Sequence, residues 1–129
     1  MSKDITQHYL DELENWGESI VFYNSSIEKL QEHLNQIIIR NSIVDIAAKV
    51  EVHQLLLEKI NTKLNQLKLE IHEQESVLMK DGHLLENSEL TKEIDLQQSD
   101  LTTRVKSCEK EFIDVKYYCN EFLSETLKK

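Results

Sequence analysis

The sequence contains no proline and only two glycines among its 129 residues. An average sequence carries about 5% proline and about 7% glycine, so a chain of this length would contain about fifteen of these turn-forming residues, and this one contains two. Sandwiches and barrels need such residues between their strands, and collagen-like, proline-rich and glycine/serine-linker proteins consist largely of them. These classes are therefore excluded, and we expect a few long helices with no β-sheet.

Basic side chains are also scarce, because 24 Asp and Glu residues stand against 15 Lys and Arg residues, which gives a net charge of −9. Nucleic-acid affinity comes mainly from Lys and Arg neutralising phosphates. The densest basic stretch is Lys128-Lys129, at the end of the sequence. We therefore expect no nucleic-acid partner, and the same acidity disfavours binding to an anionic membrane surface.

Long apolar runs are absent: none approaches the roughly 18 uncharged residues of a membrane-spanning helix, and the first ten residues lack the apolar core of a signal peptide. The two cysteines, Cys108 and Cys119, lie in one expected helix about 16 Å apart at ~1.5 Å per residue. A disulfide requires less than about 7 Å between Cα atoms. We therefore expect reduced, half-buried thiols and a cytoplasmic protein without contact to a membrane.

What the sequence does contain is apolar residues spaced alternately three and four apart, as on the buried seam of a coiled coil. Three such seams cover residues 9–37, 46–78 and 94–122. The second seam is two residues out of phase with the first, which turns it by about 200° on a continuous helix at about 100° per residue. The chain must therefore break between the first two seams.

Local residues support two breaks. Asn41 can adopt the left-handed conformation that ends a helix, and Ser42 with Asp45 has the spacing of a capping box. In the second break, Lys80 stands in a last helical turn, and Gly82 stands where a left-handed residue ends the helix. The third helix then begins either near His83 or after a cap at Asn87 or Ser88.

These breaks predict helices over about residues 4–40, 43–80 and 84–127, in one domain that covers residues 1–129. Short connections make neighbouring helices antiparallel, so the predicted fold is an all-α, up-down-up three-helix bundle with coiled-coil-like packing. This architecture resembles spectrin-type three-helix repeats, which keep a tryptophan on the inner face of their first helix; Trp16 would take that role here. The resemblance covers helix order and one residue and implies no function.

Catalytic motifs are missing. The sequence has no glycine-rich phosphate loop, no pair of cysteines with metal-ligand spacing and no zinc-protease motif. Both cysteines stand mid-helix, away from a helix N-terminus that would lower a thiol pKa. A thin bundle also offers little concave surface for an active site. We therefore expect no enzyme and no cofactor.

One candidate for a two-ligand metal site is His8, which has Asp11 and Glu12 on the same helical face one turn further on. His8 and Glu12 are the ligand candidates, but exposed charged faces often produce this arrangement. We therefore favour a surface pair without metal.

His53 is the histidine at a clear seam position, and it is the third metal candidate. It is either a functional group, pH-sensitive or half of a ligand set, or a core imidazole that hydrogen-bonds to a neighbour and fixes the helix register. We favour the second interpretation. The expected turns bring residues 112–115 level with it, and Glu111, Asp114 and Tyr118 are the expected partners. A carboxylate partner would raise the pKa of His53.

The helices carry more apolar residues than a seam requires, and Gly17 interrupts the first helix at a cost of about 1 kcal/mol relative to alanine. This glycine either admits a large neighbouring side chain or bends the helix, and we favour close packing of a side chain against it. Outward-facing apolar residues mark partner sites or are scattered surface hydrophobes. Those that we expect to contact a partner are Val21, Phe22, Ile39, Val52 and Leu55.

These residues favour a non-catalytic scaffold or adaptor that forms a homodimer or docks a partner's amphipathic helix. One alternative is a metal- or small-ligand-binding bundle that uses His8, Glu12 or His53. Another is a chaperone-like regulator that shields a hydrophobic client.

Overall fold

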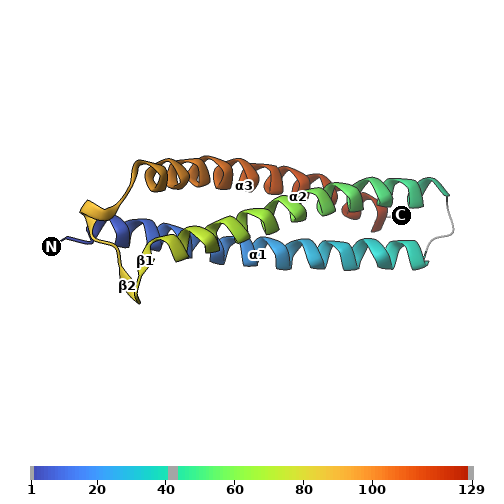
Figure 1. Cartoon of the computed structure of the whole chain (residues 1–129). Helices are drawn as coiled ribbons and strands as arrows, with labels where there is room; N and C mark the ends of the chain where they lie inside the picture. The colour runs from blue at the N-terminus through green and yellow to red at the C-terminus, as the bar shows by residue number, and fades with distance from the viewer. Residues whose placement is uncertain (1, 41–43, 128–129) are drawn as a thin grey trace. The chain divides into compact units, whose positions relative to one another are not determined.

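The structure is a computed structural model that describes residues 2–40 and 44–127 (Figure 1). It contains three long helices, α1 (Asp4–Arg40), α2 (Val44–Val77) and α3 (Lys92–Leu127). The helices pack against each other, so the predicted all-α three-helix bundle is confirmed. The predicted end signals at Asn41 and Ser42 lie outside the described residues.

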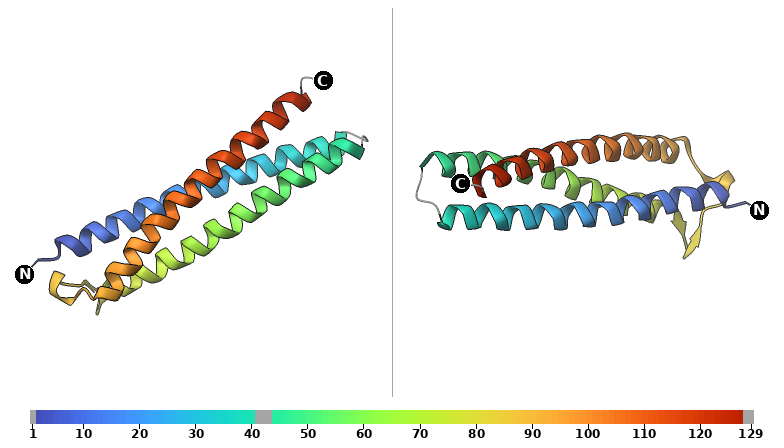
Figure 2. Two further views of the ribbon diagram at one scale, coloured as in Figure 1. Left: turned by 90° about the horizontal axis from the view of Figure 1, so that it is seen from above. Right: turned by 180° about the vertical axis from the view of Figure 1, so that it is seen from behind.

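The chain divides into two compact units. Unit 1 comprises residues 1–21 and 65–107, and unit 2 comprises residues 22–64 and 108–129. Each unit contains one segment of every helix, and within each unit the α2 segment runs antiparallel to the α1 and α3 segments (Figures 1 and 2). The single domain that the sequence suggests stays a prediction.

The predicted seams form the core of each unit, because burying one aliphatic or aromatic side chain contributes about 1.5–3 kcal/mol. Trp16, which the spectrin resemblance placed on the inner face of the first helix, is half-buried. Buried seam residues of unit 1 are Leu13, Ile20, Leu67, Ile71, Leu78, Ile94, Leu101 and Val105. Those of unit 2 are Ile27, Leu30, Leu34, Ile37, Val50, His53, Leu57, Ile60, Leu64, Cys108, Phe112 and Cys119.

A small β-hairpin follows α2, contrary to the expectation of no sheet. Strand β1 (Met79–Lys80) pairs antiparallel with β2 (His83–Leu84), and the loop between them is Asp81-Gly82. Both loop residues have positive φ, 53° and 80°, as a type I′ turn requires, and Asp-Gly is a preferred sequence for this turn. The predicted end of the second helix at Lys80 is therefore wrong: α2 ends at Val77 because the chain turns into a hairpin.

The start of α3 is also later than predicted. After the hairpin, a 3-10 turn, η1 (Asn87–Glu89), is held by a capping box in which the backbone N–H of Glu86 donates to Oε1 of Glu89 at 2.9 Å. The N-terminus of α3 is then capped by Thr91, whose Oγ1 accepts a hydrogen bond from the N–H of Ile94 at 3.2 Å. The predicted starts near His83 and at Asn87 or Ser88 are both wrong.

Asn87 instead serves the N-terminal turn of α1, within unit 1. Its Oδ1 accepts a hydrogen bond from the N–H of Ile5 at 3.0 Å, which satisfies one of the backbone donors that a helix start leaves open. Its own N–H donates to the carbonyl oxygen of Ser2 at 2.7 Å, and its Nδ2 donates to Oγ of Ser2 at 2.9 Å. A residue from the α2–α3 connection thus caps α1.

Candidate functional site

The first metal candidate pair is on the surface, as the sequence analysis favoured. Nε2 of His8 lies 3.8 Å from Oε1 of Glu12, and the His8 side chain is 69% exposed. Oε1 of Glu12 also accepts a hydrogen bond from Nε2 of Gln98 at 3.2 Å, so this carboxylate already links α1 to α3. Across residues 2–40 and 44–127, no three His, Cys, Asp or Glu side chains are grouped so that they could hold a metal ion.

The two cysteines are buried and are not joined by a disulfide, and their burial is deeper than the half-burial expected. Desolvation raises the pKa of the Cys119 thiol to about 11. Because the thiolate is the reactive form, Cys119 is a poor nucleophile at neutral pH. It acts as a small apolar side chain in the core of unit 2.

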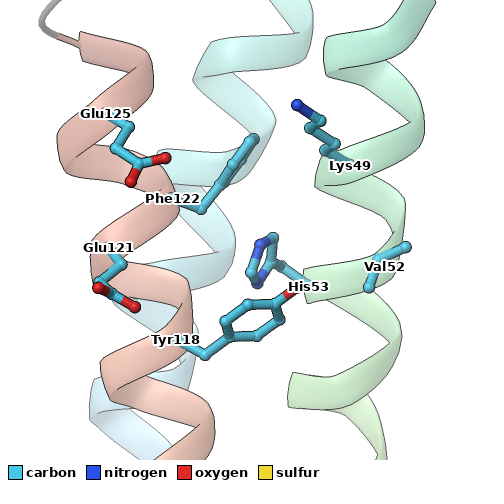
Figure 3. A pocket seen from close by; sticks show the side chains of 7 residues that line it. All are labelled: Lys49, Val52, His53, Tyr118, Glu121, Phe122 and Glu125. Carbon is cyan, nitrogen blue, oxygen red and sulfur yellow. The ribbon is translucent and has the colours of Figure 1, made fainter.

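His53 is buried in unit 2, as its seam position predicted, with 4% of its surface exposed. Figure 3 shows its imidazole pointing from α2 towards two aromatic rings of α3. The ring centroid of His53 lies 4.5 Å from that of Tyr118 and 4.6 Å from that of Phe122. Tyr118 was one of the expected partners of His53, but residues 112–115 were expected to lie beside it along the bundle. Because α3 begins later than predicted, Tyr118 and Phe122 lie beside His53 instead.

The predicted hydrogen bond that would fix the register is not found at Nδ1, which is buried and has no hydrogen-bond partner among the described residues. The expected partner Glu111 instead accepts a hydrogen bond from Nζ of Lys63 at 2.9 Å. Burial lowers the pKa of His53, because desolvation disfavours the charged imidazolium. This direction is opposite to the one that a carboxylate partner would produce.

A cavity of about 280 Å³ opens beside His53 in unit 2 (Figure 3). It has aromatic walls from α3 and a charged rim with one amine and two carboxylates. Its lining residues are Lys49, Val52, His53, Tyr118, Glu121, Phe122 and Glu125.

The five residues predicted to contact a partner are all exposed, with between 49% and 83% of their surface accessible. Phe22, Ile39, Val52 and Leu55 belong to unit 2, and Val21 belongs to unit 1. Their outward orientation follows from their positions away from the seams. Contact with a partner stays a prediction.

A second, larger hollow of about 490 Å³ lies between the α1 and α2 segments of unit 1, and we call it the unit 1 groove. Its floor includes the buried side chains of Leu13 and Ile71. Its lining residues are Leu13, Glu14, Gly17, Glu18, Val21, Lys68, Ile71, His72 and Glu75.

Gly17 stands in this groove, and the close packing expected against it is not observed. A Cβ atom built on Gly17 would meet no atom within 4 Å in the part of the chain that the structure describes. The glycine therefore leaves open space on the surface of α1. No side chain of the described residues fills that space, so the predicted reason for the glycine is wrong.

Charge is distributed unequally between the two units. Unit 1 carries 14 acidic and 6 basic side chains, a net charge of −8, whereas unit 2 carries 10 acidic and 9 basic side chains, a net charge of −1. Between Asp4 and Val21, α1 contains five acidic residues and no Lys or Arg. The unit 1 groove therefore lies in a strongly negative environment.

The unit 1 groove was not predicted from the sequence. The sequence feature that could have indicated the groove is Gly17 with Glu14 and Glu18 on one face of a helix segment that has no Lys or Arg. Sequence periodicity shows which face of a helix is apolar, but the groove also depends on which side chains of α2 stand opposite.

Comparison with known proteins found no protein-family profile, no curated protein and no solved structure that matches this chain. None of the helices in the described residues is long and apolar enough to cross a membrane.

Proposed function

We propose that this protein is a non-catalytic, cytoplasmic scaffold or adaptor that acts through protein–protein contacts and self-associates through unit 2. The observation that supports this proposal is the exposure of Phe22, Ile39, Val52 and Leu55 on the helices of unit 2. Exposed large apolar side chains of this kind favour burial against another protein surface.

The charge of unit 2 is compatible with self-association. Its net charge of −1 produces little repulsion between two copies, whereas the −8 of unit 1 would oppose close contact between two such units. On α2, Val52 and Leu55 are three residues apart, so their side chains lie on one helical face. This face is suited to packing against the same face of a second copy.

The test measures the mass of the purified protein in solution by light scattering and sedimentation over a range of concentrations. We expect a dimer, and we expect Phe22→Ser combined with Leu55→Ser to weaken dimerisation at least about tenfold, since two central apolar contacts are lost. The matched control is Leu69→Ser, which removes an equally exposed leucine from α2 in unit 1. A wild-type monomer at every concentration, or an equal effect of the control, would contradict the proposal.

A second candidate function is small-ligand binding in the His53 cavity. It is favoured by the buried Nδ1 atom, which has no hydrogen-bond partner among the described residues although an unsatisfied buried polar group costs about 1–3 kcal/mol. Native mass spectrometry, with elemental analysis of the same sample, tests it. A stoichiometric bound molecule that is lost in His53→Phe would support this function, and a ligand-free wild-type protein would contradict it.

A further inference from the structure

We propose that the unit 1 groove binds a basic amphipathic helix of another protein, with a large apolar side chain of that helix seated over Gly17. This inference rests on the proposed function as a protein-binding scaffold and assigns it a second surface and a partner of defined chemistry.

The shape of the groove suits a helix. It runs between two antiparallel helix segments, and its lining residues on α1, from Leu13 to Val21, span about 12 Å of helix at 1.5 Å per residue. Val21 is 53% exposed and gives the groove apolar surface that an added helix would cover, whereas the lining residues Leu13 and Ile71 are already buried within the unit. Grooves of this kind bind amphipathic helices through apolar anchors spaced three or four residues apart.

Gly17 is unexplained by contacts within the chain. Glycine is among the least favourable residues inside a helix, second only to proline. At this position no described side chain or backbone atom uses the space that the missing Cβ leaves. A partner that places a bulky side chain over Gly17 accounts for the residue, because any larger side chain on α1 would occupy that space.

The rim of the groove selects the charge of the partner. Glu14 and Glu18 lie one turn apart on α1 and line the groove, and neither carboxylate has an ion-pair or hydrogen-bond partner within the described part of the chain. Opposite them, Glu75 is another carboxylate, and Lys68 is the single lysine or arginine of the lining. The groove therefore favours a helix with two Lys or Arg residues, three or four positions apart, on the side that faces α1.

A second copy of this chain does not meet this requirement well. Each copy carries a net charge of −9, and −8 of it belongs to the unit that contains the groove. Two such units repel each other, whereas a cationic helix is attracted. The proposed occupant is therefore a different protein.

The test uses a synthetic amphipathic helix as the probe, namely a Leu/Lys peptide of about 18 residues, long enough to cross the groove at 1.5 Å per residue. Its leucines follow the three–four spacing, and a Leu/Glu peptide of the same pattern is the charge control. Isothermal titration calorimetry measures binding to the full-length protein. We expect one Leu/Lys peptide per chain and no binding of the Leu/Glu peptide.

Two variants locate the site, each with a matched control. Gly17→Leu fills the groove and replaces a poor helix former by a good one, so the protein should remain folded. Its control is Ser99→Leu, at an exposed position of α3 in the same unit. Glu14→Lys with Glu18→Lys reverses the rim, and its control is Glu28→Lys with Glu32→Lys, which changes the total charge equally on exposed positions of α1 in unit 2.

We expect Gly17→Leu and the reversed rim to weaken peptide binding at least about tenfold, and both controls to change it less than about twofold. Equal effects of both charge reversals would show attraction by net charge alone and would overturn the proposal. Absence of Leu/Lys binding would also overturn it, as would a dimer that Gly17→Leu converts to a monomer, because a second copy would then occupy the groove. The self-association of unit 2 is measured separately, so its failure is distinguishable from the failure of this proposal.

Discussion

The two glycines of this chain should respond in opposite directions to the same substitution. Gly17 lies inside α1, where an added Cβ meets no atom within 4 Å of the described structure, and its φ is not in the left-handed region. Replacing a helical glycine by alanine gains about 0.8–1 kcal/mol, because alanine loses less backbone freedom on folding. We therefore expect Gly17→Ala to stabilise the protein by about 1 kcal/mol.

Gly82 also has open space around its Cβ position, but its φ is +80° in the loop between β1 and β2. A side chain in the left-handed conformation costs about 1–2 kcal/mol, because Cβ comes too close to the following carbonyl oxygen. Gly82→Ala should therefore destabilise the protein by about 1 kcal/mol, after the smaller entropy of the unfolded alanine chain is subtracted. The two variants differ by about 2 kcal/mol although the chemical change is identical.

Thermal and urea denaturation followed by circular dichroism measures both effects. For a chain of this size, 1 kcal/mol corresponds to a shift of about 3–6 °C in the melting temperature. Destabilisation by Gly17→Ala would show that another group does pack against this glycine, which would refute the argument for an open groove. A neutral Gly82→Ala would refute the hairpin with positive φ at its loop.

Three further predictions concern single side chains. Burial depresses the pKa of His53 in the folded state, so the free energy of unfolding should be constant above about pH 7.5 and should decrease as the pH falls through the unfolded pKa of about 6.5. Urea titrations at several pH values measure this decrease, and His53→Leu should remove it. The control is His33→Leu, at an exposed position, which should leave the decrease unchanged. Asn87→Ala should cost about 1 kcal/mol and accelerate hydrogen exchange in the first turn of α1; unchanged exchange would contradict the capping role. Cys119, with its thiol pKa raised to about 11, should resist iodoacetamide at pH 8 until the protein is unfolded, and rapid native labelling would contradict its burial.

The seams were predictable because they depend on local spacing. Residues three and four apart share a helical face wherever the helix is placed, so periodicity alone identified buried residues such as Leu13, Leu57 and Leu101. The position of His53 in the core follows from the same rule. Its neighbours did not follow, because they depend on where α3 begins.

The segment between α2 and α3 was predicted incorrectly for two physical reasons. A glycine with positive φ ends a helix and also forms a type I′ hairpin turn, so Gly82 alone does not distinguish the two structures. The preceding Asp81 does distinguish them, because Asp-Gly favours the hairpin. Asn87 could not be assigned from local sequence, since its partners Ser2 and Ile5 lie more than 80 residues away in the chain.

Binding at the two proposed surfaces should respond differently to ionic strength, because the surface of unit 2 is apolar and nearly neutral whereas the unit 1 groove is acidic. Screening acts over about 8 Å at 0.15 M salt and about 3 Å at 1 M, so added salt should weaken the binding of a cationic helix to Glu14 and Glu18. The contact of Phe22 and Leu55 with a second copy buries apolar area, which salt does not screen and sulfate strengthens. A titration with sodium chloride, which screens charge, should therefore weaken the binding of the Leu/Lys peptide while it leaves the dimer intact. If both complexes weaken together, the dimer is held by charge, and the assignment of self-association to the apolar residues of unit 2 fails.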